Sequence, residues 1–161
     1  LEQNFQPTPG QPFIDIVGQT GTANAFLSDN QPTAEWLANL SATWVKGPLS
    51  VTGQMRYVSS GLQNYLGATP GSPNYDNRTF TRLDNNSVPS YEVFGLNASY
   101  TFEGVGPANT LRVWAAMDNV FDVDPPVATG TGFGGAANGG TNPVFFDTMG
   151  RFFRLGVSAT F

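Results

Sequence analysis

The chain has 161 residues, of which 12% are charged and 13% aromatic, and its formal net charge is −5. The negative charge disfavours nucleic acid as a partner. The absence of cysteine and histidine removes disulfides, thiol chemistry and the commonest general base. No apolar run reaches the length of about 18 residues that a transmembrane helix needs. The sequence begins at Leu1 without a signal peptide, so we expect a processed chain or a piece of a longer one.

The first part of the chain contains a predicted strand pair. Residues 12–17 are a weaker strand candidate, and a loop follows over 18–35. Residues 36–45 and 49–58 each alternate between apolar and polar side chains, with a Lys-Gly-Pro break at 46–48. Successive side chains of a strand point to opposite faces, so these two stretches predict a hairpin with a minimal turn.

Three more strands are predicted downstream. Residues 91–102, 110–121 and 151–161 alternate in the same way. Long breaks rich in Asn, Gly, Pro and Ser cover 59–89 and 122–150, whereas the break between the first two of these strands is short. The sequence therefore predicts an all-β chain of about six antiparallel strands.

Each predicted strand has one apolar face. The apolar sets are Trp36, Ala38, Leu40, Ala42 and Trp44; Leu49, Val51, Gly53, Met55 and Tyr57; Phe94, Leu96, Ala98, Tyr100 and Phe102; Leu111, Val113, Ala115 and Met117; and Phe153, Leu155, Val157, Ala159 and Phe161. Leu37 and Val45 are exceptions, since they are apolar residues on the polar side of their strand.

The lengths of the breaks alternate strictly between long and short. This alternation is typical of transmembrane β-barrels with extended outer loops and short periplasmic turns, and it places the C-terminus on the periplasmic side. Loops longer than about 15 residues are uncommon in compact domains. The sequence thus predicts part of a transmembrane barrel.

Aromatic residues gather at both ends of the predicted apolar faces. Trp44, Tyr100, Phe102 and Phe161 fall near the short turns, and Trp36, Tyr57 and Phe153 fall near the long loops. Two such bands are typical of the aromatic girdles at the two membrane interfaces. The alternative is that these rings form the core of a soluble β-sandwich.

Two segments resemble elements of the TonB-dependent outer-membrane receptors. Residues 111–126 are similar to their penultimate strand, which ends in an Asn-Leu-Phe-Asp-like element followed by prolines. Residues 142–151 are similar to the Tyr/Phe-Asp-x-x-Gly-Arg element that opens their final strand. The matching residues are Asn119, Phe121, Asp122, Asp147, Gly150 and Arg151, and the resemblance covers roughly residues 11–161.

This resemblance implies a role in nutrient uptake across the outer membrane of a Gram-negative bacterium, and no enzyme activity. Receptors of this family have a barrel of about 22 strands and an N-terminal plug that contacts TonB. The sequence lacks the plug, and about six strands are too few to close a barrel. We therefore expect residues 1–161 to be a single segment, the C-terminal part of such a barrel. Its expected partners are outer-membrane lipid, the rest of the barrel, the plug, and an unidentified small-molecule or glycan ligand. TonB is expected to be reached through the plug.

The terminal strand also predicts a recognition signal. Phe153, Leu155, Val157, Ala159 and Phe161 place apolar residues at every second position up to an aromatic C-terminus. Barrel-assembly machinery reads such a strand by adding it to a sheet edge. We expect these five residues to be that signal.

Three sets of side chains are further candidates. Arg56, Arg112, Asp118 and Arg154 fall on predicted lumen faces. In a whole receptor they meet plug carboxylates or line the substrate path; the preferred alternative is that they are solvated in a wet lumen or pair across neighbouring strands. Aromatic residues of the long breaks either grip a ligand or pack on each other: Tyr65, Tyr75, Phe80, Phe133, Phe145 and Phe146. Asp122 and Asp124 lack the spacing of a calcium loop, so loop capping is the preferred interpretation, and no cofactor or metal is expected.

Two functions from other classes stay open. Amphipathic strands with open edges are a template for pairing with other copies, so the chain is alternatively a self-assembling module that forms a multi-chain barrel or a fibre. A soluble β-sandwich adhesin would place the Trp36 and Trp44 face in a protein core. Membrane association of the chain distinguishes the barrel from the sandwich.

Overall fold

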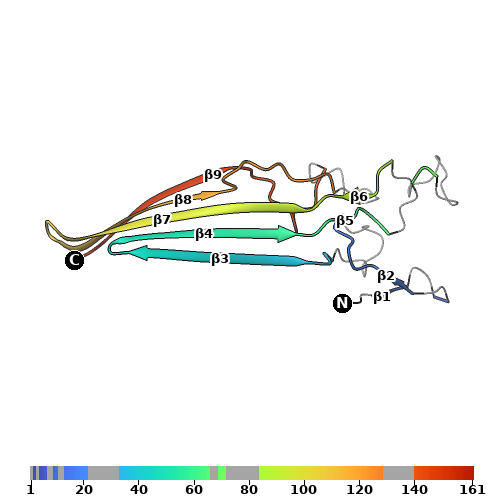
Figure 1. Ribbon diagram of the computed structural model, residues 1–161, viewed down its shortest axis with the longest axis horizontal. Coiled ribbons are helices and arrows are strands. Elements are labelled where there is room, and N and C mark those ends of the chain that lie inside the picture. Colours follow the sequence, from blue (N-terminus) through green and yellow to red (C-terminus); the bar gives the residue numbers. More distant parts are fainter. Residues whose placement is uncertain are drawn as a thin grey trace. The chain divides into compact units, whose positions relative to one another are not determined.

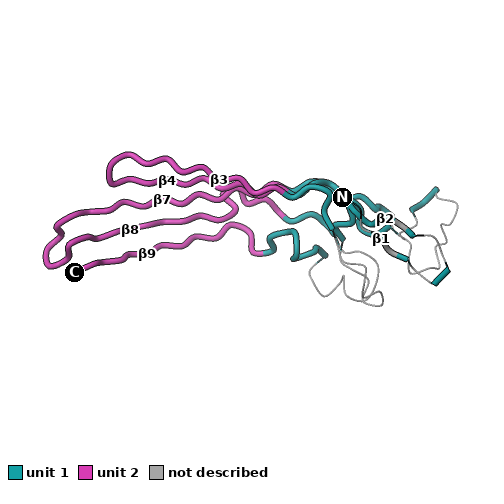
Figure 2. Tube along the Cα trace, turned by 90° about the horizontal axis from the view of Figure 1, so that it is seen from below, with its two compact units in different colours: residues 1–37, 58–91, 125–148 teal, residues 38–57, 92–124, 149–161 magenta. Residues whose placement is uncertain are grey.

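The computed structural model describes residues 2, 4–6, 9–10, 13–21, 33–65, 69–71, 84–128 and 140–161 (Figure 1). Within these ranges the regular structure is all β, without a helix, and so no helix there can cross a membrane. The chain divides into two compact units (Figure 2). Unit 1 consists of Leu1–Leu37, Val58–Tyr91 and Pro125–Thr148, and unit 2 of Ala38–Tyr57, Glu92–Asp124 and Met149–Phe161.

The main element is an open, five-stranded sheet in the order β3-β4-β7-β8-β9. Its strands are β3 (Leu37–Lys46), β4 (Leu49–Val58), β7 (Tyr91–Val105), β8 (Ala108–Asp118) and β9 (Phe152–Thr160). Each strand pairs with the next main-sheet strand along the chain, β7 with β8 and β8 with β9 in antiparallel register. Strands β3 and β9 are the two edges of this sheet.

Two Gly-Pro dipeptides make the short turns. Gly47 and Gly106 have φ values of 57° and 58°, and each precedes a proline. A positive φ at the first central position followed by proline fits the two-residue hairpin turn of type II′. The second turn is shorter than the predicted break at 103–109, because β7 and β8 continue to pair up to Val105 and Ala108. Figure 1 shows the C-terminus at the same end of the sheet as these turns.

The register joins the predicted apolar faces of three strands into one face. Across β7, β8 and β9, the apolar triplets are Leu96–Met117–Phe153, Ala98–Ala115–Leu155, Tyr100–Val113–Val157 and Phe102–Leu111–Ala159. Every member of these triplets was placed on an apolar face by alternation alone. Cross-strand pairs of this kind are the unit of sheet stabilisation.

The polar faces also coincide across the sheet. The hydroxyl groups of Thr43 in β3 and Thr52 in β4 are 2.9 Å apart and hydrogen-bonded. A Cβ built on Gly95 of β7 would lie 3.8 Å from the Gln54 side chain and 3.8 Å from the Asp118 carboxylate. Polar side chains of β3, β4 and β8 therefore share the face opposite the apolar triplets.

The predicted strand at 12–17 does not join this sheet. Of the described residues 13–17, Ile14–Asp15 (β2) lies in a strand, and it pairs with Asn4–Phe5 (β1). The strand ends there because the Asp15 carboxylate accepts the Val17 backbone N–H at 3.1 Å and Gly18 turns with a φ of 93°. The main sheet thus has five strands, rather than about six.

Unit 1 has a conventional buried core and a second small ladder. Gly61–Leu62 (β5) pairs with Ser87–Val88 (β6). Among its described residues, the largest fully buried apolar side chains are Phe146, Ile16, Val58 and Val88. The buried Asn142 side chain donates hydrogen bonds to the carbonyls of Thr20 and Gly21, at 3.0 and 3.1 Å. Residues that are 122 positions apart in the sequence are joined in this way.

Candidate functional site

The apolar face of the sheet carries exposed side chains on both edge strands and on β7 and β8, whereas its β4 residues are half-buried. Leu155 is 82% exposed, Val157 66% and Leu40 64%, although all three lie in the middle of strands. Monomeric soluble proteins rarely expose contiguous apolar patches larger than a few hundred Å². The face therefore has the chemistry of a surface that meets an apolar environment.

Aromatic rings border this face near the short turns. Trp44, Tyr100, Phe102 and Phe161 are all exposed there, and the Tyr100 and Phe102 rings lie 4.6 Å apart. Near the other end of the unit 2 strands lie Tyr57 and Phe153. Trp and Tyr rings, which have a polar group on an otherwise apolar ring, prefer the boundary between an apolar phase and water, and this applies to Trp44, Tyr57 and Tyr100.

The polar face carries the predicted lumen residues. Arg154 forms an ion pair with Asp118 at 2.6 Å, diagonally across β8 and β9. Arg112 donates to the Ser99 hydroxyl at 3.1 Å across β7 and β8. Arg56 is exposed and falls on the same face as Thr52 by alternation. These pairs fit the cross-strand interpretation for Arg112, Asp118 and Arg154.

Trp114 packs over Gly156 on the polar face. A Cβ on Gly156 would lie 2.4 Å from the Trp114 ring, which is closer than real Cβ atoms approach. Since the two residues are directly paired, the ring covers the backbone of the last strand. Aromatic cover of a strand glycine is a known device for pinning register. Alternation puts Trp114 on this face, because it lies between Val113 and Ala115 of the apolar set, but the sequence gives no sign of the contact.

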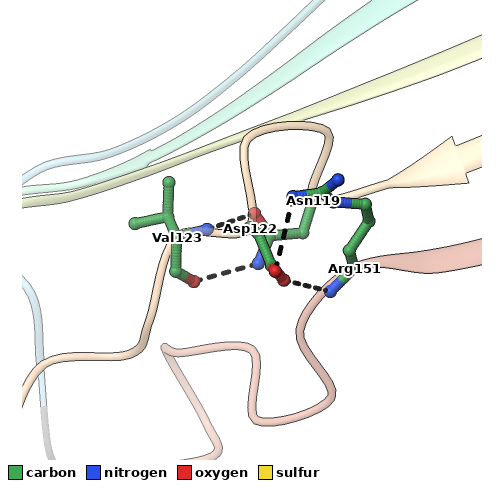
Figure 3. Close-up of polar contacts among 4 residues, drawn as sticks. All are labelled: Asn119, Asp122, Val123 and Arg151. Carbon is green, nitrogen blue, oxygen red and sulfur yellow. Dashed lines mark hydrogen bonds and ion pairs between the residues drawn. The ribbon is translucent and has the colours of Figure 1, made fainter.

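A network of hydrogen bonds and one ion pair, which we call the clasp, joins the end of β8 to the start of β9 (Figure 3). Asn119 is fully buried, its side-chain amide donates to the Val123 carbonyl at 2.9 Å, and its side-chain oxygen accepts the Val123 N–H at 2.8 Å. Asn119 has a φ of 49°, a left-handed conformation that asparagine tolerates better than most residues. The Asn119 side chain therefore closes the turn that ends β8.

Asp122 supplies the second half of the clasp. Its carboxylate accepts the Arg151 backbone N–H at 3.0 Å and lies 3.4 Å from the Arg151 guanidinium (Figure 3). Gly150 has a φ of 70°, and a Cβ there would lie 3.4 Å from the Asp122 carboxylate. Two separate motifs of the sequence, one after β8 and one before β9, thus meet at one place.

The other two motif residues lie outside the clasp. Phe121 is 67% exposed, and its ring packs edge-on against Phe94 at 5.5 Å. Asp147 belongs to unit 1, where its backbone carbonyl accepts the Tyr91 hydroxyl at 3.5 Å. Four of the six motif residues are therefore brought together by the structure.

The candidate ligand aromatics divide into three groups. Phe145 and Phe146 are buried, and Phe146 packs edge-on against Tyr91 at 5.5 Å, so neither ring is displayed for a ligand. The packing alternative fits these two, since their rings lie 6.1 Å apart and their backbone N–H groups donate to the Asn142 carbonyl at 3.2 and 3.0 Å. Tyr65 is half-buried. The remaining candidates lie outside the described residues: Tyr75, Phe80 and Phe133.

A hollow in unit 1 is lined by Tyr65 together with polar and apolar side chains, and sequence reasoning missed it. Its lining includes Glu35, Asn85 and Ser87. The Tyr65 hydroxyl donates to the Val17 carbonyl. Burial, with the nearby charges of Asp15 and Glu35, raises the pKa of Tyr65 above its ordinary value. No local pattern could have found this site, since its residues come from four separate stretches.

The described residues contain no group of three or more Asp or Glu side chains placed to hold a metal ion. Asp122, one of the two carboxylates considered for a cation, instead pairs with Arg151. This arrangement fits the loop-capping interpretation.

Comparison of the chain with protein-family models, with curated proteins and with solved structures finds no match. The resemblance to TonB-dependent receptors therefore rests on the sequence elements quoted above.

Proposed function

We propose that this chain is the C-terminal barrel portion of a TonB-dependent outer-membrane receptor that takes up a nutrient such as a siderophore, vitamin or glycan. The observation that carries the proposal is the two-sided sheet. One face is apolar on all five strands and carries exposed large apolar side chains on β3, β7, β8 and β9, and the other bears Arg, Asp, Ser and Thr side chains bonded to one another. Lipid on one side and a wet lumen on the other require this distribution.

The positions of the connections also support the proposal. Both two-residue turns lie at the end of the sheet where the chain terminates, since Thr110 pairs with Thr160. The two long connections leave the sheet at the other end. Such polarity is expected when short turns face the periplasm and long loops face outside. On this proposal, the exposed alternate residues of β9 are the strand that assembly machinery recognises, and the clasp presents that strand in fixed register.

Membrane topology can be tested with single cysteines, because the chain contains none of its own. Asp84→Cys lies in a long connection and Pro107→Cys in a short turn, and both positions are exposed. The polypeptide that carries this chain is produced in a Gram-negative host and treated with a membrane-impermeant maleimide. We expect Asp84→Cys to react on intact cells, and Pro107→Cys to react only after the outer membrane is permeabilised.

Equal labelling of the two positions on intact cells, or recovery of the protein in the soluble fraction, would overturn the membrane assignment. The transport assignment needs a second measurement. Uptake of the ligand must be lost in a host without TonB, while binding of the ligand to the cell surface is retained. Uptake that persists without TonB would contradict the receptor proposal but leave the barrel topology intact.

A self-assembling β-module is the second candidate function. The open sheet favours it, because β3 and β9 each have one side without a strand neighbour in the five-stranded sheet. Unpaired backbone groups along an edge strand recruit other strands.

A further inference from the structure

Strand β3 is an edge without the usual protection. All ten of its residues are exposed. Natural edge strands are blunted by charged residues, proline or a bulge. Between Leu37 and Val45, β3 has neither a charged residue nor a proline, and Lys46 comes only at its last position. The opposite edge, β9, carries Arg154 in its interior.

The sequence of β3 is chemically symmetric about Ser41. Reading outward from Ser41 pairs Leu40 with Ala42, Asn39 with Thr43, Ala38 with Trp44, and Leu37 with Val45. Each apolar residue meets an apolar residue, each polar residue meets a polar one, and the large Trp44 meets the small Ala38. The symmetry also accounts for the apolar character of Leu37 and Val45, which lie on the polar side of the strand and are 48% and 64% exposed, because these two residues face each other in the pairing.

Strand direction limits which edges of two copies can pair. The sheet has an odd number of strands, so β3 and β9 run in the same direction. If β9 of one copy joins β3 of another with both apolar faces on the same side, the two strands run parallel. Parallel pairing is less favourable per residue than antiparallel pairing. Pairing of β3 with β3 about a two-fold axis is antiparallel and keeps the apolar faces on the same side.

Backbone geometry is compatible with the same register. In a hairpin with a two-residue turn, the backbone groups of alternate residues point toward the partner strand and those of the others point away. Counting back from the turn at 47–48, the odd-numbered residues of β3 point away from β4. Thr43 is then in the non-hydrogen-bonded class relative to Thr52, where side chains approach most closely, and their hydroxyls are 2.9 Å apart. Ser41 consequently presents a free N–H and C=O to a second copy.

We propose that β3 is a homodimerisation edge, at which a second copy of this chain binds antiparallel with Ser41 opposite Ser41. The pair forms a ten-stranded sheet with one continuous apolar face. This inference gives the second proposed function a specific edge and register, and it rests on that function rather than on the receptor proposal. The two copies point their long connections in opposite directions, whereas the proposed barrel has all its long loops on one side. We therefore expect the dimer only when no barrel strand pairs with β3.

Cysteine cross-linking of the full chain in a mild non-ionic detergent tests the register. In Ser41→Cys, the two Cα atoms are expected about 5.5 Å apart, within the range that a disulfide requires. In the control Asn39→Cys, they are roughly 14 Å apart, at about 3.4 Å per residue along the strand. We expect a mild oxidant to convert Ser41→Cys to a covalent dimer and to leave Asn39→Cys monomeric on a denaturing gel.

The mass of the detergent-solubilised protein, measured by sedimentation, gives a second readout that needs no cross-link. Ser41→Lys places two like charges opposite each other and should convert the dimer to a monomer, whereas Ser158→Lys on the β9 edge should leave it a dimer. A wild-type monomer, preferential cross-linking of Asn39→Cys, or a dimer that only Ser158→Lys disrupts would overturn the proposal. The last result would keep self-assembly but assign it to β9.

Discussion

Two residues hold a left-handed backbone at the end of β8, where the chain leaves the sheet. Asn119 and Asp122 have φ values of 49° and 57°. A non-glycine residue in this region costs roughly 1–2 kcal/mol, so the surrounding contacts have to compensate. They do so through the bonds to Val123 and Arg151, which explains why Asn and Asp, rather than larger residues, occupy these positions.

Replacing Asp122 separates the hydrogen bond of the clasp from its ion pair. Asp122→Asn keeps an oxygen acceptor for the Arg151 N–H and tolerates the positive φ, and it loses an exposed ion pair that contributes less than about 1 kcal/mol. Asp122→Ala loses the acceptor and strains the backbone, and should destabilise the β8–β9 pair by roughly 1–3 kcal/mol. Amide hydrogen exchange at the start of β9 measures this, with Asp124→Ala as the control. Equal protection in both Asp122 variants would contradict the role given to the hydrogen bond.

The contact between Trp114 and Gly156 gives a prediction at the centre of β9. Gly156→Ala forces the Trp114 ring away from the strand and should lower the free energy of unfolding in detergent by about 1–3 kcal/mol. Gly53→Ala in β4 is the matched control, because a Cβ there has no atom within 4 Å. The effect of Gly156→Ala should shrink when Trp114 is already alanine. A loss of the same size in that background would show that the ring is not the cause.

At the scale of elements, periodicity of two was enough to place the long strands. The predicted strands at 36–45, 49–58 and 110–121 correspond to Leu37–Lys46, Leu49–Val58 and Ala108–Asp118. Alternation works here because one face of each strand is apolar throughout, so a one-residue slip would invert every side chain. The short 12–17 element failed because Gly18 and the Asp15 cap end it after two residues.

The same reasoning could not find contacts that link distant segments. The clasp joins Asp122 to Arg151 across 29 positions, and Asn142 reaches Thr20 across 122. Family resemblance marked Asp122 and Arg151 as notable, but no pattern in the sequence said that they meet. Such pairs depend on how loops fold back, which local periodicity does not encode.

The two faces of the sheet make opposite predictions for their tryptophans. A variant that keeps only Trp44 (Trp36→Phe, Trp114→Phe) places its indole on the apolar face, whereas a variant that keeps only Trp114 (Trp36→Phe, Trp44→Phe) places it on the polar face. In vesicles of brominated phosphatidylcholine, we expect strong fluorescence quenching of Trp44 and weak quenching of Trp114. Equal quenching of the two would refute the assignment of the faces, and absence of quenching in both would favour the soluble sandwich.

At the scale of the whole molecule, the two units keep their order by different means. Unit 1 buries Phe146, Ile16, Val58 and Val88 together with bonded polar side chains, as the interior of a globular domain does. In unit 2 most large apolar side chains are exposed, and the sheet relies on its ladder, the clasp and whatever covers the apolar face. Removing a buried polar group of unit 1 should therefore loosen unit 1 and leave the sheet of unit 2 unchanged.

Asn142 is the residue at which this difference can be measured. Asn142→Ala leaves the Thr20 and Gly21 carbonyls and the Val144 N–H without this partner, at a cost of about 1–3 kcal/mol for each buried group left unsatisfied. We expect faster amide exchange over 16–21, 58–65 and 140–148, and unchanged exchange in β8 and β9. The exposed Asn109→Ala is the control, since it should change neither region. Faster exchange in β8 and β9 of Asn142→Ala would show that the sheet depends on the buried core of unit 1 for its order.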